Sequence, residues 1–159
     1  MTEKAFEAGL GVIYHSRQPA PQPLLPFINV WIRPQSPDWS VSIAQVEGNL
    51  DLALLLAIRL ASSHNLQIRL VTTLQSDREM ETAEEYLEGI VDLGRLPVNT
   101  IAIAFLGDIW DCLHQAPSAE IHIFGLPNNS DGSFLKKVEE QTFGHRIFVQ
   151  GSGKENLLA

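Results

Sequence analysis

The sequence has few of the features that would mark a secreted, membrane-spanning or disulfide-stabilised protein. Its 159 residues include one cysteine, Cys112, so no disulfide can form within the chain, which fits a reducing compartment such as the cytosol. The longest apolar run, Leu52–Ile58, has seven residues, whereas a membrane helix needs about 20. The start of the chain lacks the apolar stretch of a signal peptide. We therefore expect a soluble, cytosolic chain.

Basic residues are also scarce. The chain has 11 Lys and Arg against 19 Asp and Glu, which gives a net charge of −8. The deficit is concentrated in residues 47–113, which contain eleven acidic and four basic residues. Such a surface would repel a polyanion. Nucleic acid is therefore excluded as the main partner.

What the chain does contain is an alternation of strand-like and helix-like segments. Short apolar runs typical of strands lie at Val41–Val46, Gln67–Thr72, Thr100–Phe105, Glu120–Gly125 and Arg146–Gln150. The segments between them have helical periodicity. This order predicts a three-layer α/β fold around a mostly parallel, five-stranded sheet. In such a sheet, ligands bind at the carboxyl ends of the strands.

The first forty residues differ from the rest. Four prolines lie between positions 19 and 26, and because each fixes φ and lacks an amide donor, they predict an extended linker. The following segment, Phe27–Ile32, has the apolar pattern of a strand that adds to an edge of the sheet or packs against a second copy. A brief strand is also expected at Gly9–Tyr14. We predict an N-terminal arm over 1–38, an α/β domain over 39–150 and a flexible tail over 151–159.

Helix ends are marked by residues with capping side chains. Asn49 is expected to cap a nearly all-apolar helix at Leu50–His64, and Asn65 suits the C-terminal cap of that helix. Ser76 and Glu79 have the spacing of a capping box, in which each side chain would bond a free backbone amide. The helix that follows should end at Gly94. Further expected features are a short helix at Asp108–His114 and a last helix capped by Ser130 or Asp131.

No group of residues in the sequence predicts catalysis. The five histidines lie apart from any known nucleophile motif, and Cys112 and His114 are two apart on an expected helix, so they would not face each other. Asp108, Asp111 and His114 have spacing that could hold a metal ion, but a solvated helix end explains them more simply. We therefore predict no enzyme, no catalytic residue and no metal site.

A row of acidic residues lies on one face of the helix before Gly94. Its members are Glu81, Glu84, Glu85, Glu88 and Asp92. Such a row is typical of a solvated helix surface, and it would also suit a basic partner.

One loop has the context of a ligand site. The segment from Gly125 to Ser133 follows a strand and opens a helix, as a phosphate-binding loop does. The residues that could contact a ligand there are Gly125, Asn128, Ser130, Gly132 and Ser133. The loop resembles the nucleotide loop of universal stress proteins, although Asn128 stands where that pattern has glycine and the later spacing differs. An adenine nucleotide site and a simple turn with a helix cap both stay open.

Several motifs together resemble a known family. They are Ile28-Asn-Val-Trp31, the Gly48–Asp51 turn, the leucine-rich Leu52–Arg59, Leu66–Val71, Phe105–Ile109 and Ile123–Pro127. This arrangement is similar to the cytosolic C-terminal domain of prokaryotic cation-chloride cotransporters, Na-K-Cl cotransporter-like members of the amino acid–polyamine–organocation permease superfamily. The likeness covers roughly residues 28–127. It rests on hydrophobic motifs rather than on catalytic signatures.

The resemblance implies a universal-stress-protein-like, Rossmann-like α/β domain attached below the membrane helices of a transporter. Its implied role is non-catalytic regulation, assembly or trafficking at the cytoplasmic face of the cell membrane, with the transmembrane domain as partner and no cofactor. A homodimer is also expected, because Trp31, Trp39 and the proline-rich arm offer more apolar surface than one small sheet edge should need. The alternative is a stand-alone nucleotide-binding module of the universal-stress type.

Overall fold

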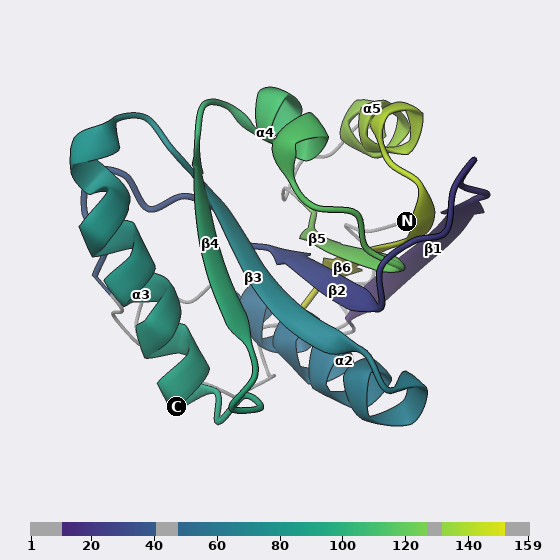
Figure 1. The fold of residues 1–159 in the computed structure, drawn as a ribbon, viewed down its shortest axis with the longest axis horizontal. Coiled ribbons are helices and arrows are strands. Elements are labelled where there is room, and N and C mark those ends of the chain that lie inside the picture. Colours follow the sequence, from purple (N-terminus) through teal and green to yellow (C-terminus); the bar gives the residue numbers. More distant parts are fainter. Residues whose placement is uncertain (1–10, 41–47, 127–131, 152–159) are drawn as a thin grey trace.

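The computed structural model describes residues 11–40, 48–126 and 132–151, and these form one six-stranded sheet with helices on both faces (Figure 1). The strands run in the order β1-β6-β5-β2-β3-β4. The elements in chain order are β1 (Val12–Gln18), β2 (Phe27–Trp31), α2 (Gly48–His64), β3 (Gln67–Leu74), a 3₁₀ turn η2 (Asp77–Glu79), α3 (Met80–Leu93), β4 (Ile101–Leu106), α4 (Ile109–Gln115), β5 (Ile121–Gly125), α5 (Ser133–Gln141) and β6 (Gly144–Gln150).

The sheet is parallel except at one edge. Strands β2 to β6 pair in parallel, whereas β1 runs antiparallel to β6. The predicted α/β class with a mostly parallel sheet is confirmed, with six strands in place of five. The strand expected at Val41–Val46 lies outside the described residues, and the brief strand expected at Gly9–Tyr14 corresponds to β1, which extends to Gln18.

The edge position predicted for Phe27–Ile32 is wrong, because β2 is a central strand between β3 and β5. Four of its five residues are buried, as a strand covered on both faces requires. The four prolines precede β2, so none of them removes an amide from its hydrogen-bond ladders. The expected division of the chain at residue 38 stays a prediction, and the strands on both sides of it belong to one sheet.

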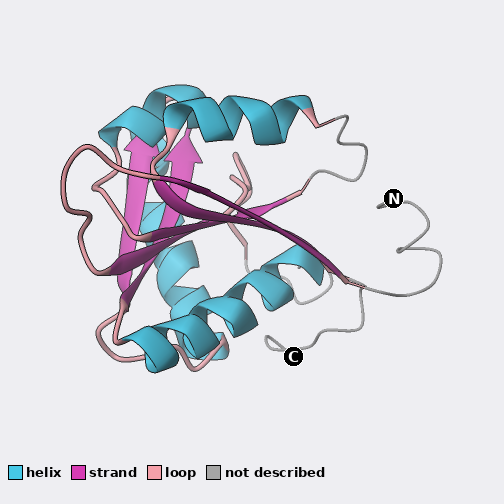
Figure 2. Ribbon diagram, turned by 90° about the vertical axis from the view of Figure 1, so that its right-hand side faces the viewer, coloured by secondary structure: helices cyan, strands magenta, loops and turns pink. Residues whose placement is uncertain are grey.

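Helices cover both faces of the sheet (Figure 2), and an apolar layer lies on each face. Residues of α2 and α3 pack on one face, around Leu54, Leu70 and Leu87. Residues of α4 and α5 pack on the other, around Phe124 and Phe148. This arrangement follows from the chain order, since the first two crossovers move outward from β2 on one side and the last two on the other.

The two tryptophans expected to support a dimer are core residues of the single chain. Trp31 is 7% exposed and stacks on Phe124 with a centroid distance of 5.8 Å. Trp39 is 5% exposed, packs edge-on against Tyr86 and donates a hydrogen bond of 2.7 Å from Nε1 to Glu79 Oε2. The apolar surface that motivated the dimer prediction at these residues is therefore used within the chain.

The capping predictions hold in part. Asn65 ends α2 with a φ of 54°, and the Leu66 amide donates to the Ala61 carbonyl, as in a left-handed C-terminal cap. Ser76 Oγ accepts from the Arg78 amide, but Glu79 bonds Trp39 instead of completing the capping box. Helix α3 ends at Gly94 as expected, although the left-handed residue there is Arg95.

At the last helix the prediction is wrong. The residue before α5 is Gly132, with a φ of 84°, and it takes the cap position expected for Ser130 or Asp131. Those two residues lie outside the described part of the chain. A left-handed backbone at this position explains why glycine, and not a capping side chain, precedes the helix.

Candidate functional site

The direction in which successive strands are added to the sheet reverses between β2 and β5. From β2 the chain moves outward through β3 and β4, then returns to place β5 on the other side of β2. At such a point the loops after the two strands separate, and a crevice forms at their carboxyl ends. The topology therefore points to the segments after Trp31 and Phe124 as the place for a ligand.

A cavity of about 370 Å³ lies at this crevice. Its wall includes Trp31 and Arg33 after β2, Asn49 at the start of α2, Asp108 at the start of α4, and Phe124 and Gly125 at the end of β5. Two aromatic rings and several polar groups thus face one space. The size is at the lower end of the range for small-molecule pockets.

Asn49 holds the strand ends at the cavity together. Its Nδ2 donates to the Leu126 carbonyl at 2.8 Å, and its Oδ1 accepts from the Gly151 amide at 2.8 Å. The side chain therefore links α2 to the segments that follow β5 and β6. Its predicted role as a helix cap is wrong, because both of its polar atoms bond to backbone beyond the helix.

Gly125 is the predicted loop residue that reaches the cavity. A Cβ added there would lie 3.4 Å from Asn49 Cβ, so the close packing of β5 on α2 leaves little room for a side chain. Gly132 and Ser133 lie at the start of α5. Asn128 and Ser130 are outside the described residues.

The sequence pattern did not indicate the residues on the other walls of the cavity as part of a site. Trp31 was taken for surface material and Asn49 for a cap, and Arg33 and Phe124 carried no signal of their own. Their position in the fold could have indicated them, since Trp31, Arg33 and Phe124 lie at or just after the ends of β2 and β5. That inference requires the knowledge that β2 is a central strand.

The start of α4 places a carboxylate on the cavity wall. Asp108 Oδ1 accepts from the amides of Trp110 at 2.8 Å and Asp111 at 3.0 Å. It is therefore the N-cap of the short helix predicted there. Among the described residues no three histidine, cysteine or acidic side chains are placed to share a metal ion.

Cys112 is unsuited to nucleophilic attack. The thiol is buried, and its pKa is raised by burial and then by the negative charges of Asp108 and Asp111. Its Sγ faces the carbonyls of Phe105 and Leu106 at 3.8 Å. A thiol held in its neutral form reacts slowly.

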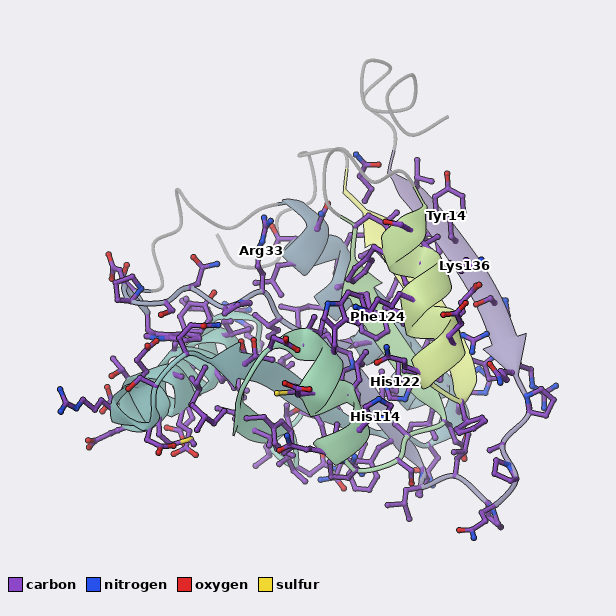
Figure 3. The ribbon with its side chains drawn as sticks, turned by 90° about the horizontal axis from the view of Figure 1, so that it is seen from above. Tyr14, Arg33, His114, His122, Phe124 and Lys136 are labelled. Carbon is purple, nitrogen blue, oxygen red and sulfur yellow. The ribbon has the colours of Figure 1, made fainter. Side chains whose placement is uncertain are left out.

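A row of buried polar side chains crosses the sheet below the cavity, on the face of α4 and α5. Asn29, Arg69, His122 and Arg146 lie beside one another in the registers of β2, β3, β5 and β6, and each is at most 6% exposed. Figure 3 shows His122 and Phe124 on the sheet between α4 and α5. Polar groups this deep must find partners inside the protein.

Backbone carbonyls supply most of these partners. Arg69 Nη1 donates to Asn29 Oδ1 and to the carbonyls of Pro117 and Ser118, while its guanidinium lies 3.5 Å from the Phe27 ring centroid. Arg146 donates to Ser16 Oγ, Gln18 Oε1 and the carbonyls of Glu139 and Thr142. The two cations thus fasten the ends of α4 and α5 to the sheet.

His122 connects this row to the aromatic wall of the cavity. Its Nδ1 accepts a hydrogen bond of 3.2 Å from Trp31 Nε1. Burial lowers the pKa of His122 to about 4, and the positive charges of Arg146 and Arg69 act in the same direction. The ring is therefore neutral at physiological pH and serves as an acceptor that fixes the Trp31 ring.

The comparisons with known proteins agree with this architecture. A family model described as "Prokaryotic cation-chloride cotransporter, C-terminal domain, 2nd" matches residues 25–158. The chain belongs to this family. The resemblance seen in residues 28–127 is confirmed, and the matched range of this cation-chloride cotransporter domain includes β2 and the whole cavity wall.

A solved structure supports the same assignment. The cytoplasmic domain of a prokaryotic cation chloride cotransporter, determined by crystallography, is 28% identical in sequence and superposes with a TM-score of 0.84. The match covers 99% of this cotransporter-family domain and 58% of the solved chain. No curated protein sequence matches, and no helix of the described residues is long and apolar enough to cross a membrane.

Proposed function

We propose that this domain is a non-catalytic regulatory and dimerisation module at the cytoplasmic face of a cation-chloride-cotransporter-like secondary transporter. The observation that carries the proposal is the family match over residues 25–158. The likeness to one part of a larger cytoplasmic domain supports it as well. The raised pKa of the buried Cys112 thiol, which keeps it protonated, also favours binding and assembly over nucleophilic chemistry.

The proposal predicts that removal of the domain alters transport without abolishing it. We expect chloride-dependent Rb⁺ uptake by the parent transporter in proteoliposomes to change several-fold per molecule when residues 25–158 are deleted. A transporter carrying Glu84→Gln, an exposed position on α3, is the control. Light scattering of the isolated chain should show a dimer. Unchanged uptake in the deletion variant, with equal amounts in the membrane, would contradict the regulatory role.

A second candidate function is the binding of an adenine nucleotide in the cavity between β2 and β5. Its support is the position of the cavity at the change of sheet direction and the presence of Trp31 and Phe124 on its wall. Aromatic faces can stack on a base, and Arg33 and the start of α2 lie beside them. Regulation of a transporter by a nucleotide would be compatible with both candidates.

Gly125 provides a graded test of this second function. We expect ATP or AMP to bind with micromolar affinity in calorimetry, and Gly125→Val to abolish that binding because its methyl groups occupy the space against Asn49. Gly125→Ala is the matched control. Its single Cβ would sit 3.4 Å from Asn49 Cβ, which a small adjustment tolerates. Absence of heat with the unmodified chain, or equal affinity in all three proteins, would rule out the nucleotide site.

A further inference from the structure

Two histidines face each other across the antiparallel edge of the sheet. His15 on β1 and His145 on β6 place their ring nitrogens Nε2 and Nδ1 at 2.8 Å. The rings are nearly parallel, with centroids 5.1 Å apart and an interplanar angle of 15°. His15 is exposed and His145 is half-buried, so solvent reaches the pair. Neither histidine lines the cavity between β2 and β5.

The strands hold these rings at a fixed separation. Arg17 pairs with His145 and His15 pairs with Ile147 in the β1–β6 register, so the two histidines are diagonal neighbours. The His145 amide donates to the Glu120 carbonyl at 2.8 Å, which anchors the start of β6. A pair placed by backbone hydrogen bonds on both strands loses little freedom when it binds a ligand.

We propose that His15 and His145 together hold one divalent transition-metal ion of the borderline class, such as Zn²⁺, Ni²⁺ or Cu²⁺, with water completing its coordination. Imidazole nitrogen is a preferred ligand of these ions. With metal–nitrogen bonds of 2.0–2.1 Å, two neighbouring ligands of one ion lie about 3 Å apart. The observed 2.8 Å is close to this separation, and the rings must turn so that both lone pairs point at the ion instead of along the line between the nitrogens.

Between two neutral imidazoles, the proton count of this step balances without a release. In the metal-free pair one ring donates its proton to the other ring, whose facing nitrogen is bare. Metal binding needs both facing nitrogens bare, so the bridging proton moves to the far nitrogen of the ring that carried it. Each imidazole then stays neutral and binds the ion through a lone pair.

The charges around the pair set the affinity. The pKa of His145 is lowered by burial and by the positive charges of His15, Arg17 and Arg146, and is raised in part by Glu120. Arg17 weakens the attraction for a cation and Glu120 strengthens it. Arg146 is turned to the opposite face, where it bonds Ser16 and Gln18. We therefore expect micromolar rather than tighter binding.

The consequence for the fold is a metal-dependent link between β1 and the rest of the sheet. Strand β1 is the antiparallel edge strand and has β6 as its strand partner (Figure 1). An ion bound to both strands would stabilise the folded chain, by an amount that grows with the logarithm of the free ion concentration above the dissociation constant. This inference is independent of the proposed function, since neither transport nor the cavity enters it.

The test is calorimetric titration of the full chain, without a histidine tag, with Zn²⁺, Ni²⁺ and Cu²⁺. We expect one equivalent to bind, and His15→Gln or His145→Gln to weaken the affinity by at least about tenfold, because a single imidazole loses the second, pre-positioned ligand. The double variant should bind at least as weakly as either single variant. Mg²⁺ should not compete, because it prefers oxygen ligands.

An exposed single histidine gives the matched control. His114→Gln should leave the affinity unchanged, because its exposed side chain lies on α4, which packs on the opposite face of the sheet from His145. Circular dichroism checks that each variant is folded. In the unmodified protein, the electron paramagnetic resonance spectrum of Cu²⁺ should show two nitrogen ligands. Equal affinity in His145→Gln, or a spectrum with one nitrogen ligand, would overturn the site.

Discussion

Replacing Gly144 by alanine is expected to destabilise the domain by at least about 3 kcal/mol, a large part of the 5–15 kcal/mol typical of a folded domain. Gly144 has a φ of 83°, where a side chain costs about 1–2 kcal/mol. A Cβ at this position would also lie 2.6 Å from the Glu120 carbonyl oxygen and 3.1 Å from that of Ala119. Both contacts are with backbone, so the start of β6 or the segment before β5 must move.

Urea unfolding followed by circular dichroism measures this loss, and Gly132 supplies the matched control. Gly132 has almost the same φ, 84°, but no atom within 4 Å of an added Cβ. Gly132→Ala should therefore cost only the conformational part, about 1–2 kcal/mol. Equal losses at the two positions would show that the contact with the Glu120 carbonyl contributes nothing.

The sequence predicts the sheet well where hydrophobic periodicity acts locally. The expected strand at Gln67–Thr72 corresponds to β3, and α3 buries Ala83, Leu87 and Ile90, which lie on one face at helical spacing. Strand order is a different matter, because it depends on contacts between distant segments. The proline-rich linker made Phe27–Ile32 look peripheral, yet this segment forms β2, which is buried on both faces, as a central position requires.

The candidate site was less predictable than the fold. A loop rich in glycine and serine has a recognisable pattern, and this pattern indicated Gly125 as a residue of the site. Asn49 was predicted to be a local cap because the sequence gives only its neighbours along the chain. Its actual partners, the Leu126 carbonyl and the Gly151 amide, are distant in sequence. The same holds for Glu79, whose carboxylate bonds Trp39, forty residues away. A polar side chain near a helix end can bond to a local or to a distant partner, and the tertiary structure determines which of the two it bonds.

The buried polar row shows why His122 carried no signal. A histidine between isoleucines in a strand is indistinguishable from a core residue until Asn29, Arg69 and Arg146 are seen beside it. Its neighbours then determine its chemistry. Two buried cations and a tryptophan donor disfavour a second proton on the ring. Protonation of His122 in acid is therefore expected to lower the stability of the fold.

Acidification is accordingly expected to destabilise the domain through His122. The pKa of this ring is about 4 in the folded chain against 6.5 when it is exposed, so the unfolded chain binds the proton more readily. The contribution of His122 to stability is fully present above about pH 6.5 and is lost as the pH falls toward 4. At about 1.4 kcal/mol per pH unit, the whole loss is about 3 kcal/mol.

The measurement is the free energy of unfolding in urea between pH 7 and pH 4, for the unmodified chain and for His122→Gln. Glutamine keeps an acceptor for Trp31 Nε1 but does not titrate, so the part of the pH dependence that belongs to His122 should vanish. Other titrating groups are common to both proteins, and His114→Gln, at an exposed position on α4, leaves His122 in place and should retain the part of the dependence that belongs to His122. If the His122→Gln variant lost as much stability toward pH 4 as the unmodified chain, the neutral buried ring would not be the group that responds to acid. The response would then have to come from groups elsewhere in the chain, and the row formed by Asn29, Arg69, His122 and Arg146 would be a structural support without pH dependence.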